Sequence, residues 1–173
     1  MSVSPERRKS LREHARRILA ARSITQPAIP IDRIAKSMDI VLRYAPFDDE
    51  LSGMAFIKDS LPFIAVNALH HPHRQRFTIG HELAHHVLHA DILAKGVHVD
   101  KVILRRDQLA ATGTDDVEIE ANIFASELLI PENMILPIVT QEIHLDDENR
   151  LLEIARRFKV SLAALQFRLA ALD

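Results

Sequence analysis

The chain has 173 residues, 47% of them hydrophobic, which suffices for one folded domain with a sizeable core. Its 22 basic and 24 acidic residues leave a formal net charge of −2, which argues against a dedicated nucleic-acid binder because such proteins usually carry a basic excess. There are no cysteines, so disulfides and thiolate metal sites are excluded and any metal must be held by His, Asp or Glu.

Residues 1–17 lack the apolar run of a secretory signal, and no stretch approaches the roughly 18 apolar residues that cross a membrane. We therefore expect a soluble, cytoplasmic protein without membrane association. A helix is predicted over residues 5–22, where apolar residues recur at helical spacing, and a short helix over residues 31–39. The basic run of the first helix is interpreted as a solvated face, with binding to nucleic acid or an acidic partner as the alternative.

Three segments with strand-like patterns come next. Residues 40–45 are rich in β-formers, residues 51–58 alternate, and residues 61–67 are nearly all apolar. The Asp59-Ser60 pair predicts a tight turn between the last two. We expect a small three-stranded antiparallel sheet, in which residues 61–67 are the best candidate for the central strand.

Helices dominate the second half. A long helix is predicted over residues 72–90, since Pro72 suits a first helical position. A second covers residues 116–130, with Asp115 or Asp116 as its N-cap, and residues 97–106 are a further strand candidate. The chain is thus predicted to be a single α+β domain over residues 1–173: N-terminal helices and sheet over 1–70, the two long helices over 72–90 and 116–130, and a C-terminal helical bundle over 131–173.

The sequence His81-Glu82-Leu83-Ala84-His85 is an HExxH motif inside a helical pattern. Two histidines four residues apart lie on the same helix face, so both imidazoles can reach one ion at about 2.0–2.1 Å. Glu82 is offset by one residue and can take a proton from a metal-bound water. The motif therefore predicts a metal site with Glu82 as its general base.

A catalytic zinc needs a third protein ligand. The metzincin pattern would require Gly and His where this chain has Leu88 and Asp91, which leaves a glutamate from another helix as the common solution. Glu118 and Glu120 are the candidates and face about 200° apart, so only one can bind. Asn122 shares a face with Glu118 and could orient a ligand histidine. Together with the family resemblance given below, this favours Glu118, with Glu120 as the alternative.

Two linked segments carry a resemblance to a known family. Residues 74–89, with the HExxH motif, are followed by residues 104–131, where Glu-x-x-Ala-Asn-x-Phe-Ala precedes Leu-Leu-x-Pro. This arrangement resembles the ImmA/IrrE family of bacterial metallopeptidases, and the likeness extends to residues 51–54 and 66–67. The resemblance implies a zincin-type helix packed on the sheet and a Zn²⁺ ion held by three ligands with one base and one orienting amide. By position these are His81, His85 and Glu118, then Glu82 and Asn122.

By that resemblance the protein would be a zinc-dependent, gluzincin-like endopeptidase. Its substrate would be an Xre-type helix-turn-helix repressor or antitoxin, cleaved in a stress response or a toxin–antitoxin pair. The alternative is a partner-binding regulator or toxin-like module that keeps a metal site without proteolysis. The residue that stabilises the oxyanion is left open among Tyr44, Arg76, His86 and His144.

Two weaker signals remain. His89, four residues beyond His85, is interpreted as a buried, hydrogen-bonded histidine at the helix end. The tail resembles a helix-turn-helix with Ser161 as an N-cap, but its apolar stripe favours packing. Only Lys159, Gln166 and Arg168 could address DNA, and direct nucleic-acid binding is not expected.

Overall fold

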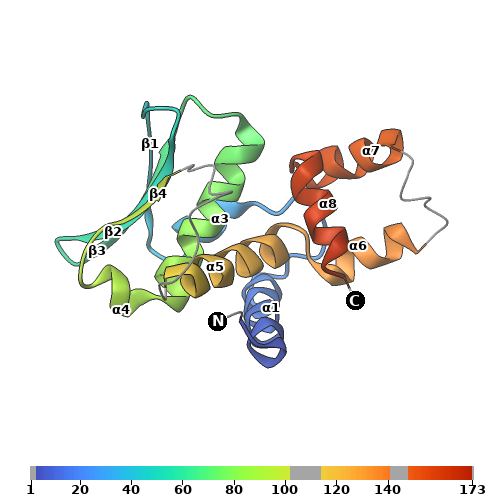
Figure 1. Cartoon of the computed structure of the whole chain (residues 1–173), viewed down its shortest axis with the longest axis horizontal. Coiled ribbons are helices and arrows are strands. Elements are labelled where there is room, and N and C mark those ends of the chain that lie inside the picture. The colour runs from blue at the N-terminus through green and yellow to red at the C-terminus, as the bar shows by residue number, and fades with distance from the viewer. Residues whose placement is uncertain (1–2, 102–113, 141–147, 173) are drawn as a thin grey trace.

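The computed structural model describes residues 3–101, 114–140 and 148–172. A sheet lies at one end, two long helices cross in the middle, and three helices form the other end (Figure 1). The prediction of an α+β fold is confirmed. The elements are α1 (Pro5–Ala20), α2 (Ile31–Lys36), β1 (Val41–Ala45), β2 (Leu51–Lys58), β3 (Leu61–Asn67), α3 (Pro72–Leu88), α4 (Ala90–Leu93), β4 (His98–Lys101), α5 (Thr114–Leu129), α6 (Glu132–Val139), α7 (Glu148–Phe158) and α8 (Leu162–Ala170).

The sheet differs from the predicted antiparallel meander. It has four strands in the order β1-β3-β2-β4, and β1 pairs with β3 in parallel while the other pairs are antiparallel. After two chain reversals β1 and β3 point the same way, so placing β3 beside β1 makes that pair parallel. The nearly all-apolar β3 gains a neighbour on each side, as expected for a central strand, and Asp59 and Ser60 form its turn with β2 at φ 52° and 63°.

A buried asparagine organises the loops between the sheet and α3. The Asn67 side-chain amide donates to the backbone oxygens of Phe47 and Asp48 at 3.2 Å and of Leu51 at 2.8 Å. Its side-chain oxygen accepts from the backbone N–H groups of residues 47 and 69. Gln75 in α3 donates to the Asn67 carbonyl oxygen at 3.2 Å, so the end of β3 is tied to the start of the helix.

Small residues set how closely α3 approaches its neighbours. A Cβ atom built on Gly80 would lie 3.4 Å from the Ala125 Cβ, so α3 and α5 pack tightly at this crossing. On the sheet side, a Cβ on Gly53 would lie 2.4 Å from Thr78 Cγ2 and 2.8 Å from the Ala65 carbonyl oxygen. Glycine at this position in β2 therefore lets the sheet lie directly against α3.

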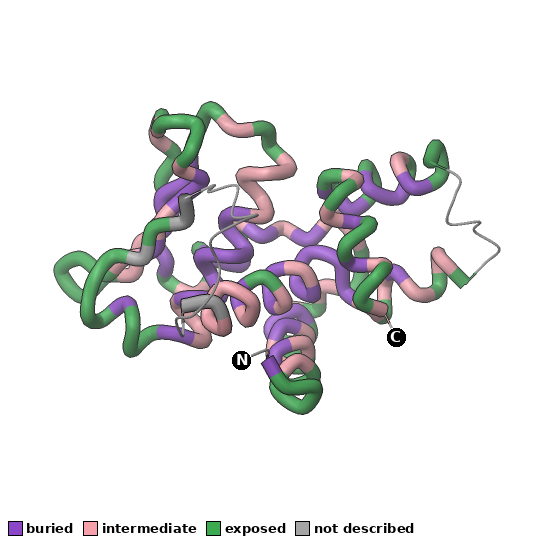
Figure 2. Tube along the Cα trace, in the orientation of Figure 1, coloured by how far each residue is buried: buried purple, intermediate pink, exposed green. Residues whose placement is uncertain are grey.

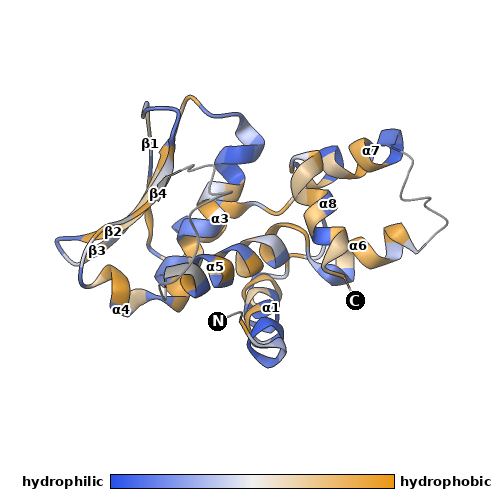
Figure 3. Cartoon of the chain, viewed as in Figure 1, coloured by the Kyte–Doolittle hydropathy of each residue, from blue (hydrophilic) through white to orange (hydrophobic). Residues whose placement is uncertain are grey.

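The buried residues gather around α3, α5 and the adjoining part of α1 (Figure 2). Hydrophilic residues dominate the first turns of α3, whereas apolar residues line its middle (Figure 3). Within the described residues no single helix has the length and apolar character to cross a membrane. Only α5 and α6 together meet those criteria, as a pair bent by 62°.

An ion pair buried between α5 and α8 anchors the C-terminal helices. Arg168 is 2% exposed and Glu127 is fully buried, and their side chains form a short ion pair. Arg168 also donates to the Ile130 carbonyl oxygen at 3.0 Å, while Arg16 of α1 donates to Glu127 at 2.7 Å. The predicted N-cap at Ser161 is confirmed. Arg168 therefore serves packing and is not available to contact DNA.

Candidate metal centre

His81 and His85 lie one turn apart on the buried middle of α3. Their side chains are 4% and 1% exposed, and the two Nε2 atoms are 3.1 Å apart. The rings are inclined at 72°, with centroids 4.8 Å apart, so both Nε2 atoms point to a common region. Helical spacing alone brings these two nitrogens together.

Glu118 of α5 reaches the same region from the facing helix. Its Oε2 atom lies 3.2 Å from His81 Nε2, and its Oε1 atom lies 3.7 Å from His85 Nε2. The Glu118 side chain is 29% exposed, so this side of the cluster opens to solvent. One ligand atom from each of the three residues can be chosen so that all lie within 4.8 Å of one another.

These separations fit a tetrahedral ion. Two ligands at about 2.0–2.1 Å from zinc in tetrahedral geometry lie about 3.3 Å apart. The two Nε2 atoms are 3.1 Å apart, and the nearest Glu118 oxygens lie 3.2 Å (Oε2) from His81 Nε2 and 3.7 Å (Oε1) from His85 Nε2, which is close to that value. Two imidazoles and one carboxylate are also a donor set that zinc accepts in catalytic sites. The residues present therefore fit a divalent zinc ion.

The Nδ1 atoms of His81 and His85, the outer ring nitrogens that point away from the cluster, each have a partner. His81 Nδ1 donates to Asn122 Oδ1 at 3.0 Å. His85 Nδ1 lies 3.2 Å from His89 Nδ1, and His89 Nε2 donates to the Glu120 carboxylate at 3.1 Å. His89 therefore links the outer nitrogen of His85 to the Glu120 carboxylate. With these outer nitrogens held, both Nε2 atoms face the same region as the Glu118 carboxylate, where the three side chains could coordinate one cation.

The structure places Glu118, rather than Glu120, beside His81 and His85. Glu120 points to the other side of α5, where Arg7 of α1 donates to its two carboxylate oxygens at 2.7 and 2.5 Å. The hydrogen bond from Arg7 is the main cause that lowers the pKa of Glu120, with a further contribution from His89. The two glutamates therefore have different partners because they lie on opposite faces of one helix.

Arg7 is a part of the site that the sequence did not suggest, whereas Glu120 was suggested only as an alternative metal ligand. His89 was expected to be buried and hydrogen-bonded, and it is 6% exposed between His85 and Glu120. Arg7, in contrast, belongs to the basic run expected to face solvent, and it lies 113 residues from Glu120 in the chain. The histidine spacing of four gave a signal for His89, but no local pattern pointed to Arg7.

Glu82 is fully buried on α3 beside the two histidines. A Cβ atom on Gly53 would lie 3.7 Å from Glu82 Cγ, so β2 forms the wall next to this carboxylate. The absence of a side chain at Gly53 therefore lets β2 pack directly against this part of α3. The position suits a carboxylate that acts next to the ion rather than on it.

The structure describes three of the four candidates for an oxyanion-stabilising group, and these three lie in different places. His86 donates to the Phe63 carbonyl oxygen at 2.8 Å and so faces the sheet. Arg76 donates to the carbonyl oxygens of Ile29 and Lys159, at 2.7 and 3.1 Å. Tyr44 is 50% exposed on β1, and position 144 lies outside the described residues. The hydrogen bonds of residues 76 and 86 indicate roles in holding elements together.

A family model described as the IrrE N-terminal-like domain, a peptidase family, matches residues 35–170. The chain belongs to this family. The resemblance expected from the two linked motifs is thereby confirmed. The match places the chain in a peptidase family, and within the described residues His81, His85 and Glu118 form a group that could hold a metal ion.

The fold of this IrrE-like domain is similar to that of a Mycobacterium tuberculosis transcriptional regulator, with a TM-score of 0.63 and 18% sequence identity. The match covers 94% of this chain and 46% of the regulator, so the chain spans less than half of that protein's length. At this identity the likeness shows the fold alone. No curated protein matches the sequence.

Proposed function

We propose that this IrrE-like domain is a zinc-dependent endopeptidase, with His81, His85 and Glu118 as zinc ligands. The convergence of these three side chains from α3 and α5 carries the proposal. The family match supports the same reaction class. Asn122 and His89 hold the outer nitrogens of the two histidines and would keep the rings in their ligating orientation.

Glu82 is the proposed general base. When bound, zinc would polarise the scissile carbonyl and lower the pKa of a coordinated water toward about 7. Glu82 would accept the proton of the attacking water and deliver it to the leaving amine. Its full burial next to the histidines supports this role, since a carboxylate in a dry site is a stronger base than one in water.

The proposed substrate is a protein, and the proposed class is an Xre-type helix-turn-helix repressor or antitoxin. Two observations support it: membership of the IrrE-like family, and the fold likeness to a protein named as a transcriptional regulator. Cleavage of such a repressor in the cytoplasm would relieve repression during a stress response or within a toxin–antitoxin pair.

The test combines metal content with cleavage. Wild-type protein is expected to retain about one zinc per chain in elemental analysis, Glu82→Gln to keep it, and Glu118→Ala to lose it. The zinc-loaded chain is then incubated with a panel of purified Xre-type repressors, and fragments are identified by mass spectrometry. Glu82→Gln is expected to lower the cleavage rate by at least about 100-fold.

Glu13→Gln on the exposed side of α1 is the matched control, because it makes the same chemical change on a surface glutamate. It is expected to cleave as the wild type does. Cleavage that survives Glu82→Gln would refute the role of the base. Intact repressors, together with equal biological activity of wild type and Glu82→Gln, would instead favour the non-proteolytic regulator.

A further inference from the structure

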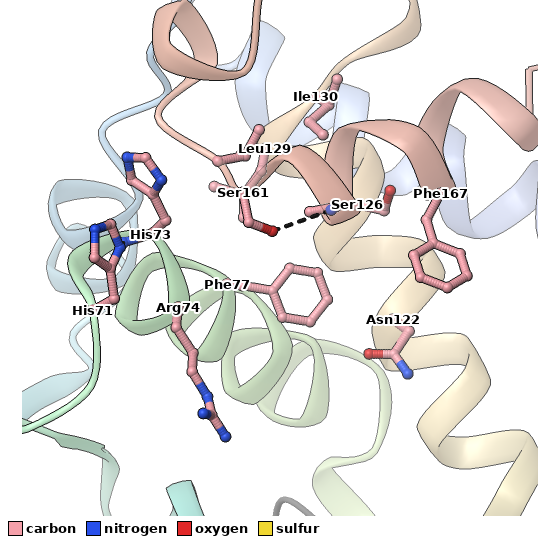
Figure 4. Close-up of a pocket in the computed structure, with 12 residues that line it drawn as sticks. His71, His73, Arg74, Phe77, Asn122, Ser126, Leu129, Ile130, Ser161 and Phe167 are labelled. Atoms are coloured by element: carbon pink, nitrogen blue, oxygen red, sulfur yellow. Dashed lines mark hydrogen bonds between the residues drawn. The ribbon is translucent and has the colours of Figure 1, made fainter. Parts of the chain in front are cut away.

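A pocket of about 640 Å³ lies between α3, α5 and α8, beside the candidate metal centre. Figure 4 shows Phe77 and Phe167 on two sides of it, with Asn122 near its lower edge and the histidines of the first turn of α3 at the opposite side. Its volume is in the range of about 300–1,000 Å³ typical of ligand sites.

The pocket borders the metal centre through two of its lining residues. Asn122 lines the pocket, and its Oδ1 atom accepts the hydrogen bond from His81 Nδ1 at 3.0 Å. Phe77 also lines it, and its ring centroid lies 6.4 Å from that of His81. These two residues stand one helical turn from His81 and Glu118. Since an extended peptide advances about 3.3 Å per residue, a chain with its scissile bond at the ion would reach the pocket within a few residues.

The lining residues favour an apolar side chain of a ligand, flanked by ligand residues that are negatively charged or neutral. Leu129, Ile130 and Val160 form much of the wall, and Phe167 contributes a ring that is 80% exposed to solvent. Such exposure of a large aromatic side chain beside a concave apolar surface is typical of a binding site. The cation Arg74 lies at the rim, where its guanidinium donates to Ser52 Oγ at 3.2 Å and points away from the apolar lining, and no carboxylate is among the lining residues (Figure 4).

The α8 wall of the pocket is held in place from behind. Arg168, the residue after Phe167, is 2% exposed and is paired with the buried Glu127 of α5. Its second bond, to the Ile130 carbonyl oxygen, fixes α8 against the end of α5. Phe167 therefore projects from a rigid helix, so little conformational entropy is lost when a ligand packs against its ring.

We propose that this pocket binds an apolar segment of the protein substrate, next to the scissile bond, with an acidic residue of that segment facing Arg74. The inference rests on the proposed peptidase function and names the substrate feature that it recognises. It places a determinant of specificity on α8, away from the HExxH motif.

The test measures peptide binding apart from cleavage. Fluorescent ten-residue peptides in a Gly-Ser background carry a central Leu-Phe pair followed by Asp, the same pair followed by Lys, or a Ser-Ser pair followed by Asp. Affinity for the zinc-loaded Glu82→Gln chain is measured by fluorescence anisotropy. The Leu-Phe-Asp peptide is expected to bind at least about tenfold more tightly than the Ser-Ser-Asp peptide.

Three further substitutions, each made in the Glu82→Gln chain, test whether the peptide binds in this pocket. Phe167→Ala is expected to weaken Leu-Phe-Asp binding about tenfold at an unchanged melting temperature, since the ring is mostly exposed. Leu61→Ala, which also truncates a large exposed apolar side chain, at 50% exposure on β3 and away from the pocket, is the control and should bind as the parent does. Arg74→Gln should remove the preference for Asp over Lys.

Equal affinity for the Leu-Phe-Asp and Ser-Ser-Asp peptides, or no effect of Phe167→Ala, would overturn the proposal. So would a fall in sedimentation coefficient on Phe167→Ala, because it would mean that a second copy of the chain fills the pocket. Each of these results leaves zinc content and Glu82-dependent cleavage untouched. Conversely, absence of cleavage would sink the peptidase proposal while the binding measurements still report on the pocket.

Discussion

Replacing Arg168 with methionine removes one half of the ion pair buried between α5 and α8. Glu127 would keep its hydrogen bonds from Arg16 at 2.7 Å and from the Glu132 backbone N–H at 3.1 Å, but it would lose the Arg168 guanidinium. The Ile130 carbonyl oxygen would also lose its donor. Because Glu127 is fully buried, water cannot replace what is removed.

The expected loss is about 3–5 kcal/mol of unfolding free energy, the usual result of breaking a buried pair from one side. For a chain of this size it corresponds to a fall in melting temperature of roughly 6–20 °C. Burial lowers the pKa of Arg168, with the charge of Glu127 acting in the opposite direction. Desolvation therefore outweighs attraction, and removing both partners should harm the fold less than removing one.

Urea denaturation followed by circular dichroism would measure this as a double-mutant cycle. Glu127→Leu combined with Arg168→Met is expected to be more stable than Arg168→Met alone. Arg157→Met, on the exposed side of α7, is the control and should stay within about 0.5 kcal/mol of wild type. A loss below about 1 kcal/mol for Arg168→Met, or a double variant as unstable as the sum of the singles, would refute the reasoning.

Three further predictions concern the metal centre, the sheet and pH. His89→Ala is expected to weaken zinc affinity about 10–100-fold, because His85 loses the partner of its Nδ1 atom. His89→Gln should recover part of the zinc affinity, and competition with a chromophoric chelator measures the affinity of both variants. Gly53→Ala is expected to lower the unfolding free energy by about 1–3 kcal/mol in urea, since its methyl would meet the sheet backbone, whereas Gly96→Ala, in open space, should be neutral. Burial, with a further contribution from nearby arginines, lowers the pKa of His14 in the folded protein below its ordinary value of 6.5. Between this lowered pKa and 6.5, the folded protein therefore binds fewer protons than the unfolded chain. The stabilisation from neutral His14 should be fully present above pH 6.5 and be lost as the pH falls from 6.5 through the lowered pKa. His14→Gln should therefore reduce the dependence of the unfolding free energy on pH, as measured by denaturation from about pH 5 to pH 8.

Local helical geometry explains why much of the site could be predicted. A spacing of four residues puts His81 and His85 on one face of any helix, and the same rule separates Glu118 from Glu120 by about 200°. The strand patterns and the N-cap at Ser161 are equally local. These features depend on residues within one or two turns of each other, so the sequence contains the information directly.

Other features were decided by packing between distant segments. The parallel β1–β3 pair follows from β3 entering the sheet beside β1, which alternation within a strand does not specify. Arg7 reaches Glu120 because α1 packs on α5, and Phe167 faces a pocket because Arg168 turns inward. Periodicity tells which residues share a face, but only the packing of elements far apart in the chain determines what that face meets.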